Sequence, residues 1–142
     1  MLGRRELSEA QVRQRLGRKG HEAGDIEEAV DRLKREHAID DARVAWAIAR
    51  TETGIKRRGA LRVRQEIARA GIAPATARAA LDDVFEGIDT AALLDAALAK
   101  RLRHGRVIAD EREFARLYRY LMAQGFESDR VLKVLAGRRS RT

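Results

Sequence analysis

The chain has no cysteine, a single proline, and aromatic residues at only 4% of its 142 positions. Without cysteine it has neither a disulfide framework nor a thiolate metal site. No apolar run approaches the roughly 18 residues that a membrane-spanning helix needs. The first residues also lack the apolar core and the cleavage site of a signal peptide. We therefore expect a cytoplasmic protein that has no membrane segment.

Charged residues and helix formers dominate what is present. The chain holds 30 Lys and Arg against 22 Asp and Glu, which gives a net charge of +8. Hydrophobic residues make up 44% of the chain, which is too high a share for disorder. Abundant Ala, Leu, Arg and Glu with so little Pro favour helices throughout. The excess of positive charge predicts a polyanionic or acidic partner.

Three stretches resemble one another when they are aligned on a glycine, namely residues 12–20, 63–71 and 117–125. Each has two apolar residues four positions apart, with the glycine four positions later. Glycine just past the end of a helix adopts a positive φ at no steric cost. The similarity continues into the next apolar segment, so the sequence predicts a helix–turn–helix unit that occurs three times.

Apolar spacing and helix-start signals predict eight helices. The start signals are a capping box at Ser8 and Gln11, Pro74 in a first turn, and the cap residues Asp40, Asp89, Asp110 and Ser128. The expected helices are 8–19, 24–36, 41–51, 59–70, 74–86, 90–103, 111–124 and 128–137. The predicted fold class is all-α, an elongated array of three-helix repeat modules. We expect the modules at 1–54, 55–106 and 107–142, the last with a basic C-terminal tail.

Residues suited to catalysis or metal binding are few. His21, His37 and His104 are far apart, and none forms a recognisable ligand motif with another histidine or a carboxylate three or four residues away. The pair Asp40 and Asp41 precedes a predicted helix, so capping explains it better than a metal site does. There is no nucleophile elbow, phosphate loop or dinucleotide fingerprint. The sequence therefore predicts a protein that is not an enzyme and that binds no metal or cofactor.

Lysine and arginine collect where no acid is interleaved, at 56–58, at 100–106 and in the tail. The planar guanidinium group of arginine suits both phosphate and carboxylate. A solvated helix face explains any single cluster equally well, whereas Arg58, Arg62 and Arg69 are expected on one helical stripe. The candidate binding residues are Arg15, Arg18, Lys19, Lys56, Arg57, Arg58, Arg62, Lys100, Arg103, Arg106, Arg138, Arg139 and Arg141.

Two kinds of nucleic-acid binding receive less support. Aromatic residues are scarce and Trp46 is expected to pack in a core, so stacking on single-strand bases is not favoured. Contacts with the phosphate backbone or with a protein fit better. The repeated turn makes an autonomous helix-turn-helix DNA-binding protein the natural alternative. However, the helices after the first two turns are acidic, and a recognition helix is expected to be basic.

Four segments together resemble one family in the order of its repeats. They are RELSEAQVRQRLGRKG at 5–20, IDDARVA at 39–45, RGALRVRQEI at 58–67 with Gly71 and Ile72, and FARLYRYLMAQGF at 114–126. In these segments the chain resembles the RecX regulators of the bacterial RecA recombinase.

The resemblance implies an elongated array of three-helix modules that lies in the groove of the RecA–single-stranded DNA filament and bridges neighbouring protomers. Such a protein inhibits strand exchange, ATP hydrolysis and the co-protease activity that triggers the SOS response. The implied partners are the RecA filament and the single-stranded DNA within it, and weak binding to free DNA stays open. We expect a monomer whose basic residues dock by electrostatic attraction.

Overall fold

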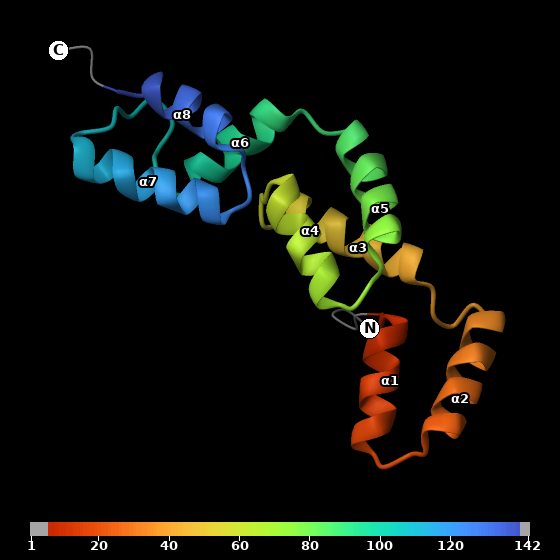
Figure 1. The fold of residues 1–142 in the computed structure, drawn as a ribbon. Helices are drawn as coiled ribbons and strands as arrows, with labels where there is room; N and C mark the ends of the chain where they lie inside the picture. Colours follow the sequence, from red (N-terminus) through yellow and green to blue (C-terminus); the bar gives the residue numbers. More distant parts are fainter. Residues whose placement is uncertain (1–5, 140–142) are drawn as a thin grey trace.

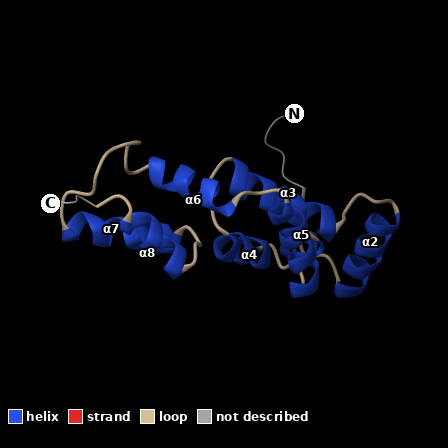
Figure 2. Ribbon diagram, turned by 90° about the horizontal axis from the view of Figure 1, so that it is seen from above, coloured by secondary structure: helices blue, strands red, loops and turns tan. Residues whose placement is uncertain are grey.

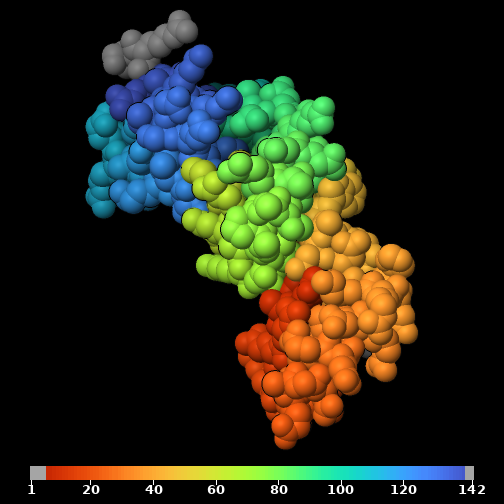
Figure 3. All heavy atoms as spheres, turned by 45° about the vertical axis from the view of Figure 1, so that its right-hand side comes forward, coloured from red at the N-terminus to blue at the C-terminus, as the bar shows by residue number. Residues whose placement is uncertain are grey.

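The computed structural model describes residues 6–139, which form eight α-helices in an elongated arrangement (Figure 1; Figure 3). They are α1 (Glu9–Arg18), α2 (Ala23–Arg35), α3 (Asp41–Gly54), α4 (Ala60–Arg69), α5 (Pro74–Glu86), α6 (Thr90–Ala99), α7 (Glu111–Ala123) and α8 (Ser128–Ala136). All eight predicted helices are confirmed, although α3 runs on to Gly54 and α6 ends early, at Ala99. No helix in this part of the chain is long and apolar enough to cross a membrane.

Most of the predicted helix starts are confirmed. Ser8 and Gln11 form the capping box, and Pro74 occupies the first turn of α5. The side chains of the predicted aspartate caps each accept a bond from the backbone N–H three residues on, at Asp40, Asp89 and Asp110. Ser128 was wrong as a cap. The helix begins at Ser128 itself, with Glu127 at the cap position, and the Ser128 hydroxyl lies 2.8 Å from that of Tyr118.

Two hydrophobic clusters divide the array. The first joins α3, α4 and α5 around Val63 and Ile67, and the second joins α6, α7 and α8 around Leu98 and Leu121. In the ribbon, α7 and α8 lie at one end of the molecule and α2 at the other (Figure 2). The hairpin of α1 and α2 contributes little, since α1 has no buried residue and α2 has only Val30. A packing unit therefore consists of a helix–turn–helix pair and the helix that precedes it.

This grouping is one helix out of phase with the repeats of the sequence. The sequence repeats begin at α1, α4 and α7, whereas the packing units begin at α3 and α6. A boundary between residues 54 and 55 separates α3 from the two helices against which it packs. The expected ranges 1–54, 55–106 and 107–142 stay a prediction about the repeats.

Two of the three repeat glycines, Gly71 and Gly125, form joints between neighbouring units. Gly20, Gly71 and Gly125 all have positive φ, at 89°, 77° and 97°. At the Gly125 turn, the Gly59 N–H donates to the Gln124 carbonyl at 2.8 Å, and the Leu61 N–H donates to the Gly125 carbonyl at 3.2 Å. A helix leaves N–H groups unpaired at its start and carbonyls unpaired at its end. Here N–H groups at the start of α4 donate to carbonyls at the end of α7.

The Gly71 turn is used in the same way. The Ser8 hydroxyl donates to the Ala70 carbonyl, and a Cβ added to Gly71 would overlap Ala10. The start of α1 therefore meets the end of α4, as the start of α4 meets the end of α7. The third turn is open, because a Cβ on Gly20 would have no neighbour within 4 Å.

We predict that Gly59→Ala destabilises the protein by about 1–3 kcal/mol, the usual cost of overpacking. Gly59 has φ −84°, which alanine adopts freely, so the effect would be purely steric. The new Cβ would lie 2.5 Å from the Gly125 carbonyl oxygen and 2.9 Å from Cδ1 of Phe126. Urea unfolding followed by far-ultraviolet circular dichroism measures the change.

The matched control is Gly17→Ala, since Gly17 lies within α1 and a Cβ there would meet open space. Alanine favours a helix over glycine by about 0.5–1 kcal/mol, so this variant should lose no stability. Equal unfolding midpoints for Gly59→Ala and the wild type would show that the joint is not closely packed.

Candidate interaction surface

The predicted basic residues of the α3–α4 region are mostly bound internally. Glu52 is 3% exposed, and its carboxylate lies 2.7 Å from the Arg58 guanidinium and 3.1 Å from Nζ of Lys56. Arg62 binds Glu66 at 3.0 Å and also donates to the carbonyl of Ala123 in α7 at 3.0 Å. These three cations therefore stabilise the region in which α3, α4 and α7 meet.

The predicted stripe of Arg58, Arg62 and Arg69 was wrong in its first member. Helix α4 begins at Ala60, so Arg58 precedes it and does not follow the helical periodicity. Its side chain turns back to Glu52, whereas Arg69 stays exposed on α4. A buried carboxylate six residues earlier in the chain was the signal that could have indicated this role.

The pKa of Glu52 reflects two opposed influences. Burial disfavours the charged carboxylate and by itself would raise the pKa. Hydrogen bonds from Arg58 and Lys56 outweigh burial, and the pKa of Glu52 lies below its ordinary value. The group is therefore charged at neutral pH, as the centre of a buried cluster with two cations.

The C-terminal arginines are also engaged. The Arg138 guanidinium donates to the carbonyls of Arg103 at 2.7 Å and Arg106 at 3.0 Å. Arg139 pairs with Glu111 at 3.1 Å and lies 4.0 Å from the centre of the Phe114 ring. The two side chains hold the end of α8 against the α6–α7 loop. Arg141 lies outside the described residues.

The remaining candidates are exposed, and they fall into two groups. Seven of them form no ion pair with any residue that the structure describes: Arg15, Arg18, Lys19, Arg57, Lys100, Arg103 and Arg106. The first three lie at the end of α1, beside the α1–α2 turn that forms one tip of the molecule (Figure 1). The other four lie at the end of α6 or in the loops that follow α3 and α6.

The fold brings these two loops together. Nζ of Lys100, at the end of α6, donates to the carbonyls of Ile55 at 3.3 Å and Lys56 at 3.2 Å. Segments that are 45 residues apart in sequence thus become neighbours. We call residues 55–58 and 100–106 the two-loop surface. It carries four of these seven cations without an ion pair, and we regard it as the main candidate for binding a partner.

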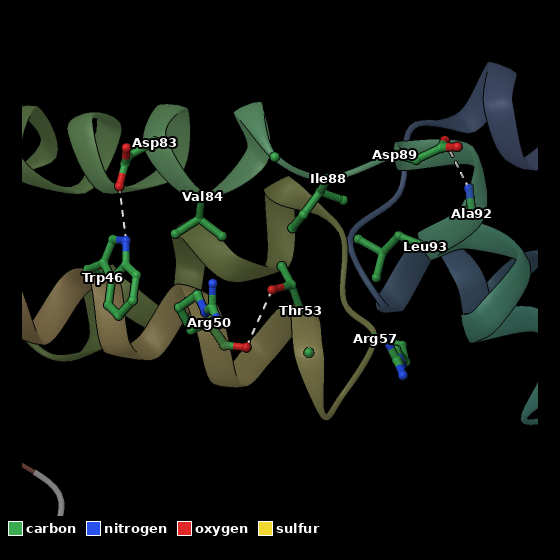
Figure 4. A pocket seen from close by; sticks show the side chains of 12 residues that line it. Trp46, Arg50, Thr53, Arg57, Asp83, Val84, Ile88, Asp89, Ala92 and Leu93 are labelled. Atoms are coloured by element: carbon green, nitrogen blue, oxygen red, sulfur yellow. Dashed lines mark hydrogen bonds between the residues drawn. The ribbon is translucent and has the colours of Figure 1, made fainter.

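Trp46 was expected in a core, and that expectation was wrong. The residue is 43% exposed, and its indole N–H donates to Asp83 of α5 at 2.9 Å (Figure 4). The buried face of α3 instead carries Ala45 and Ala49, small residues that let α5 approach closely. Trp46 is one position further round the helix, on the same stripe as exposed Arg50. The small size of the core residues was the signal that could have indicated this.

Within residues 6–139 no three His, Asp or Glu side chains lie close enough together to hold a metal ion.

Comparisons with known proteins agree on one family. Two family models match, described as "RecX, first three-helix domain" over residues 1–33 and "RecX, second three-helix domain" over residues 40–81. The second range begins at the start of α3 and ends within α5, so it covers most of the first hydrophobic cluster.

Similar proteins named "Regulatory protein RecX" occur in several bacteria. The protein of Chromohalobacter salexigens is 34% identical over 96% of this chain and 86% of its own length. The protein of Acidithiobacillus ferrooxidans is 33% identical over 99% of this chain and 87% of its own. A solved structure described as "Crystal structure of regulatory protein RecX" has a TM-score of 0.77 at 21% identity. That likeness, which concerns the fold, covers 94% of this chain and 64% of the other.

We predict that Arg58→Gln lowers the free energy of unfolding by about 2–3 kcal/mol, because it leaves the buried Glu52 with one partner fewer. The control is Arg57→Gln, whose side chain is exposed and forms no ion pair with any described residue, and which should change stability by less than about 0.5 kcal/mol. Thermal unfolding compares the two. Equal losses would contradict a structural role for Arg58.

The lowered pKa of Glu52 predicts how stability depends on pH. The cluster contributes fully above the ordinary glutamate pKa of about 4.3, and the contribution is lost as the pH falls through the lower folded-state value. The stability gap between wild type and Glu52→Gln should therefore shrink between about pH 7 and about pH 3. Urea midpoints measured across this range test it. A gap that stayed constant down to the acid end would show that Glu52 does not ionise as described.

Proposed function

The chain belongs to the RecX family of regulatory proteins, and from this premise we propose that it regulates RecA by binding the RecA–single-stranded DNA filament. It acts as a monomer in the cytoplasm and lies in the filament groove, where it bridges neighbouring RecA protomers. Bound in this way, it inhibits strand exchange, ATP hydrolysis and the co-protease activity of RecA.

The separation of the unpaired cations along the molecule carries this proposal. One group lies at the end of α1 and the other on the two-loop surface, which is built from helices of both hydrophobic clusters. A filament repeats the same protein and phosphate groups at regular intervals. Two separated basic groups on one elongated molecule suit contact with more than one of these intervals.

The joints support an inhibitory rather than a passive role. The start of α4 is hydrogen-bonded to the end of α7, and there is no room at Gly59 for an additional carbon atom. A molecule with close-packed joints resists changes in its own length. When it bridges protomers, it opposes the relative movement that ATP hydrolysis and strand exchange require.

The docking residues of this proposal are the exposed cations. Arg57, Lys100, Arg103 and Arg106 meet acidic groups of RecA and exposed phosphate from the two-loop surface, and Arg15, Arg18 and Lys19 do so at the tip. Arg141 is kept as a candidate of the tail. Lys56, Arg58, Arg62, Arg138 and Arg139 act indirectly, because their contacts shape the loops that present the others.

The alternative, an autonomous helix-turn-helix DNA-binding protein, meets an electrostatic difficulty. In α5, which follows the second glycine turn, Asp82 and Asp83 are both exposed. A helix of this charge is repelled by the phosphates that line a DNA groove. A comparison of binding to RecA filaments and to naked single-stranded DNA tests both the RecA regulator and the autonomous DNA-binding protein.

We predict stronger binding to preassembled RecA filaments than to the same naked single strand at one near-physiological salt concentration, with a fall in ATP hydrolysis. The double variant Arg103→Glu, Arg106→Glu should bind filaments at least about tenfold more weakly, which corresponds to about 1.4 kcal/mol. Fluorescence anisotropy of the labelled protein measures binding, and a coupled assay measures hydrolysis.

The control makes the same charge change at two exposed arginines outside both basic groups, Arg78→Glu and Arg116→Glu. It should keep the wild-type affinity for filaments. An equal loss in both double variants would show that net charge alone matters. Equal binding of the wild type to filaments and naked DNA would favour the autonomous DNA-binding protein.

A further inference from the structure

A groove opens beside Trp46, at the junction of the two hydrophobic clusters. Its volume is about 550 Å³, within the usual range of ligand pockets. Trp46 and Arg50 of α3 form one side, Val84 of α5 and Ile88 the other, and Leu93 of α6 closes one end (Figure 4). The buried side chains of Val84 and Leu93 make part of its wall apolar.

The indole of Trp46 is held in place without being buried. Its N–H donates to Asp83 at 2.9 Å, which fixes the orientation of the ring, and the Arg50 guanidinium lies 5.1 Å from the ring centre. Indole rings and guanidinium planes both offer flat faces on which nucleic-acid bases stack. This pair is therefore an oriented stacking surface that is open to solvent.

Positive charge is available around the groove. Arg50 and Arg57 are exposed, and neither forms an ion pair within residues 6–139. Two carboxylates also line the groove and keep their negative charge: Asp83 accepts from the indole N–H, and Asp89 accepts from the N–H of Ala92 at the start of α6. Arg57 also belongs to the two-loop surface, so the cationic side of the groove continues into that surface.

We propose that this groove binds one or two nucleotides of single-stranded nucleic acid. A base stacks on the Trp46–Arg50 pair, and the phosphates that follow contact Arg57 and the two-loop surface. The strand has to be single, because bases within a duplex are stacked on each other and cannot enter. A polyanion that also carries flat bases matches a stacking surface that leads, past Arg57, onto an extended basic surface better than an isolated acidic side chain does.

This site requires no RecA, so it is tested on the protein alone. Trp46 is the only tryptophan of the chain, and its fluorescence reports directly on the groove. Titration with oligothymidylate at low salt should quench the fluorescence to saturation, while a duplex of equal length should leave it largely unchanged. The quenching should weaken as salt is added, since phosphate contacts release counterions.

The variants separate this groove from the rest of the basic surface. Arg50→Gln and Arg57→Gln should each weaken oligothymidylate binding severalfold, whereas Arg78→Gln on the outer side of α5 should not. Trp46→Ala, followed by the anisotropy of a labelled oligonucleotide, should bind about fivefold or more weakly, the usual effect of losing a stacking partner. Circular dichroism checks that each variant is folded.

Two results would overturn the proposal. Saturable oligonucleotide binding by anisotropy with no change in Trp46 fluorescence would place the strand elsewhere on the protein. An acidic peptide that quenched as strongly as oligothymidylate at equal ionic strength would make the groove a peptide site. Filament binding by Trp46→Ala is measured separately, so failure of this site and failure of the proposed regulation of RecA are distinguished.

Discussion

The contact between a helix start and a glycine turn holds the array together. No single unit has a large core, and the α1–α2 hairpin buries one residue of its two helices. The units are joined where Gly59 meets Gly125 and where Ser8 meets the end of α4. These contacts need a positive φ and the absence of a side chain, so the repeat glycines serve both the turn and the joint. The spacing of the basic groups along the molecule follows from these joints.

The joints also determine which charges are available to a partner. Glu52 and Glu66 each bind arginines near the α4 start, and these arginines then stabilise the junction instead of facing solvent. The cations that stay exposed are concentrated at loops and helix ends. At the two-loop surface, Lys100 binds the carbonyls of residues 55 and 56 and so holds their loop against the end of α6. The excess of positive charge in the composition is therefore exposed mainly at the end of α1 and on the two-loop surface. The Trp46 groove lies beside the largest of these places.

Local signals in the sequence were sufficient to predict the helices. The eight ranges, the aspartate caps and the glycine turns depend on neighbours within one or two helical turns, and the structure confirms them. What failed depends on which side chains become buried when the helices pack. Arg58 turns to a buried carboxylate, and Trp46 is displaced from the core by small alanines that bring α5 close. The union of the two loops through Lys100 has no local signal at all.

The same reason explains why the packing units could not be inferred from the repeats. A repeat is detected by similar spacing along the chain, whereas a packing unit depends on which preceding helix covers each hairpin. Here α3 and α6 cover the hairpins that follow them, so the cores are shifted by one helix from the repeat. The two-loop surface arises at this shift, since it combines the loop after α3 with the loop after α6.

Hydrogen–deuterium exchange of the whole protein, with RecA filaments and separately with an equal amount of naked single strand, tests the central claim most directly. The account predicts that filaments slow exchange at residues 55–58 and 100–106 and at the end of α1, more than naked DNA does, while exposed positions on the outer side of α5 are unchanged. Protection that is absent from the two loops, or that is equal with naked DNA, would contradict it.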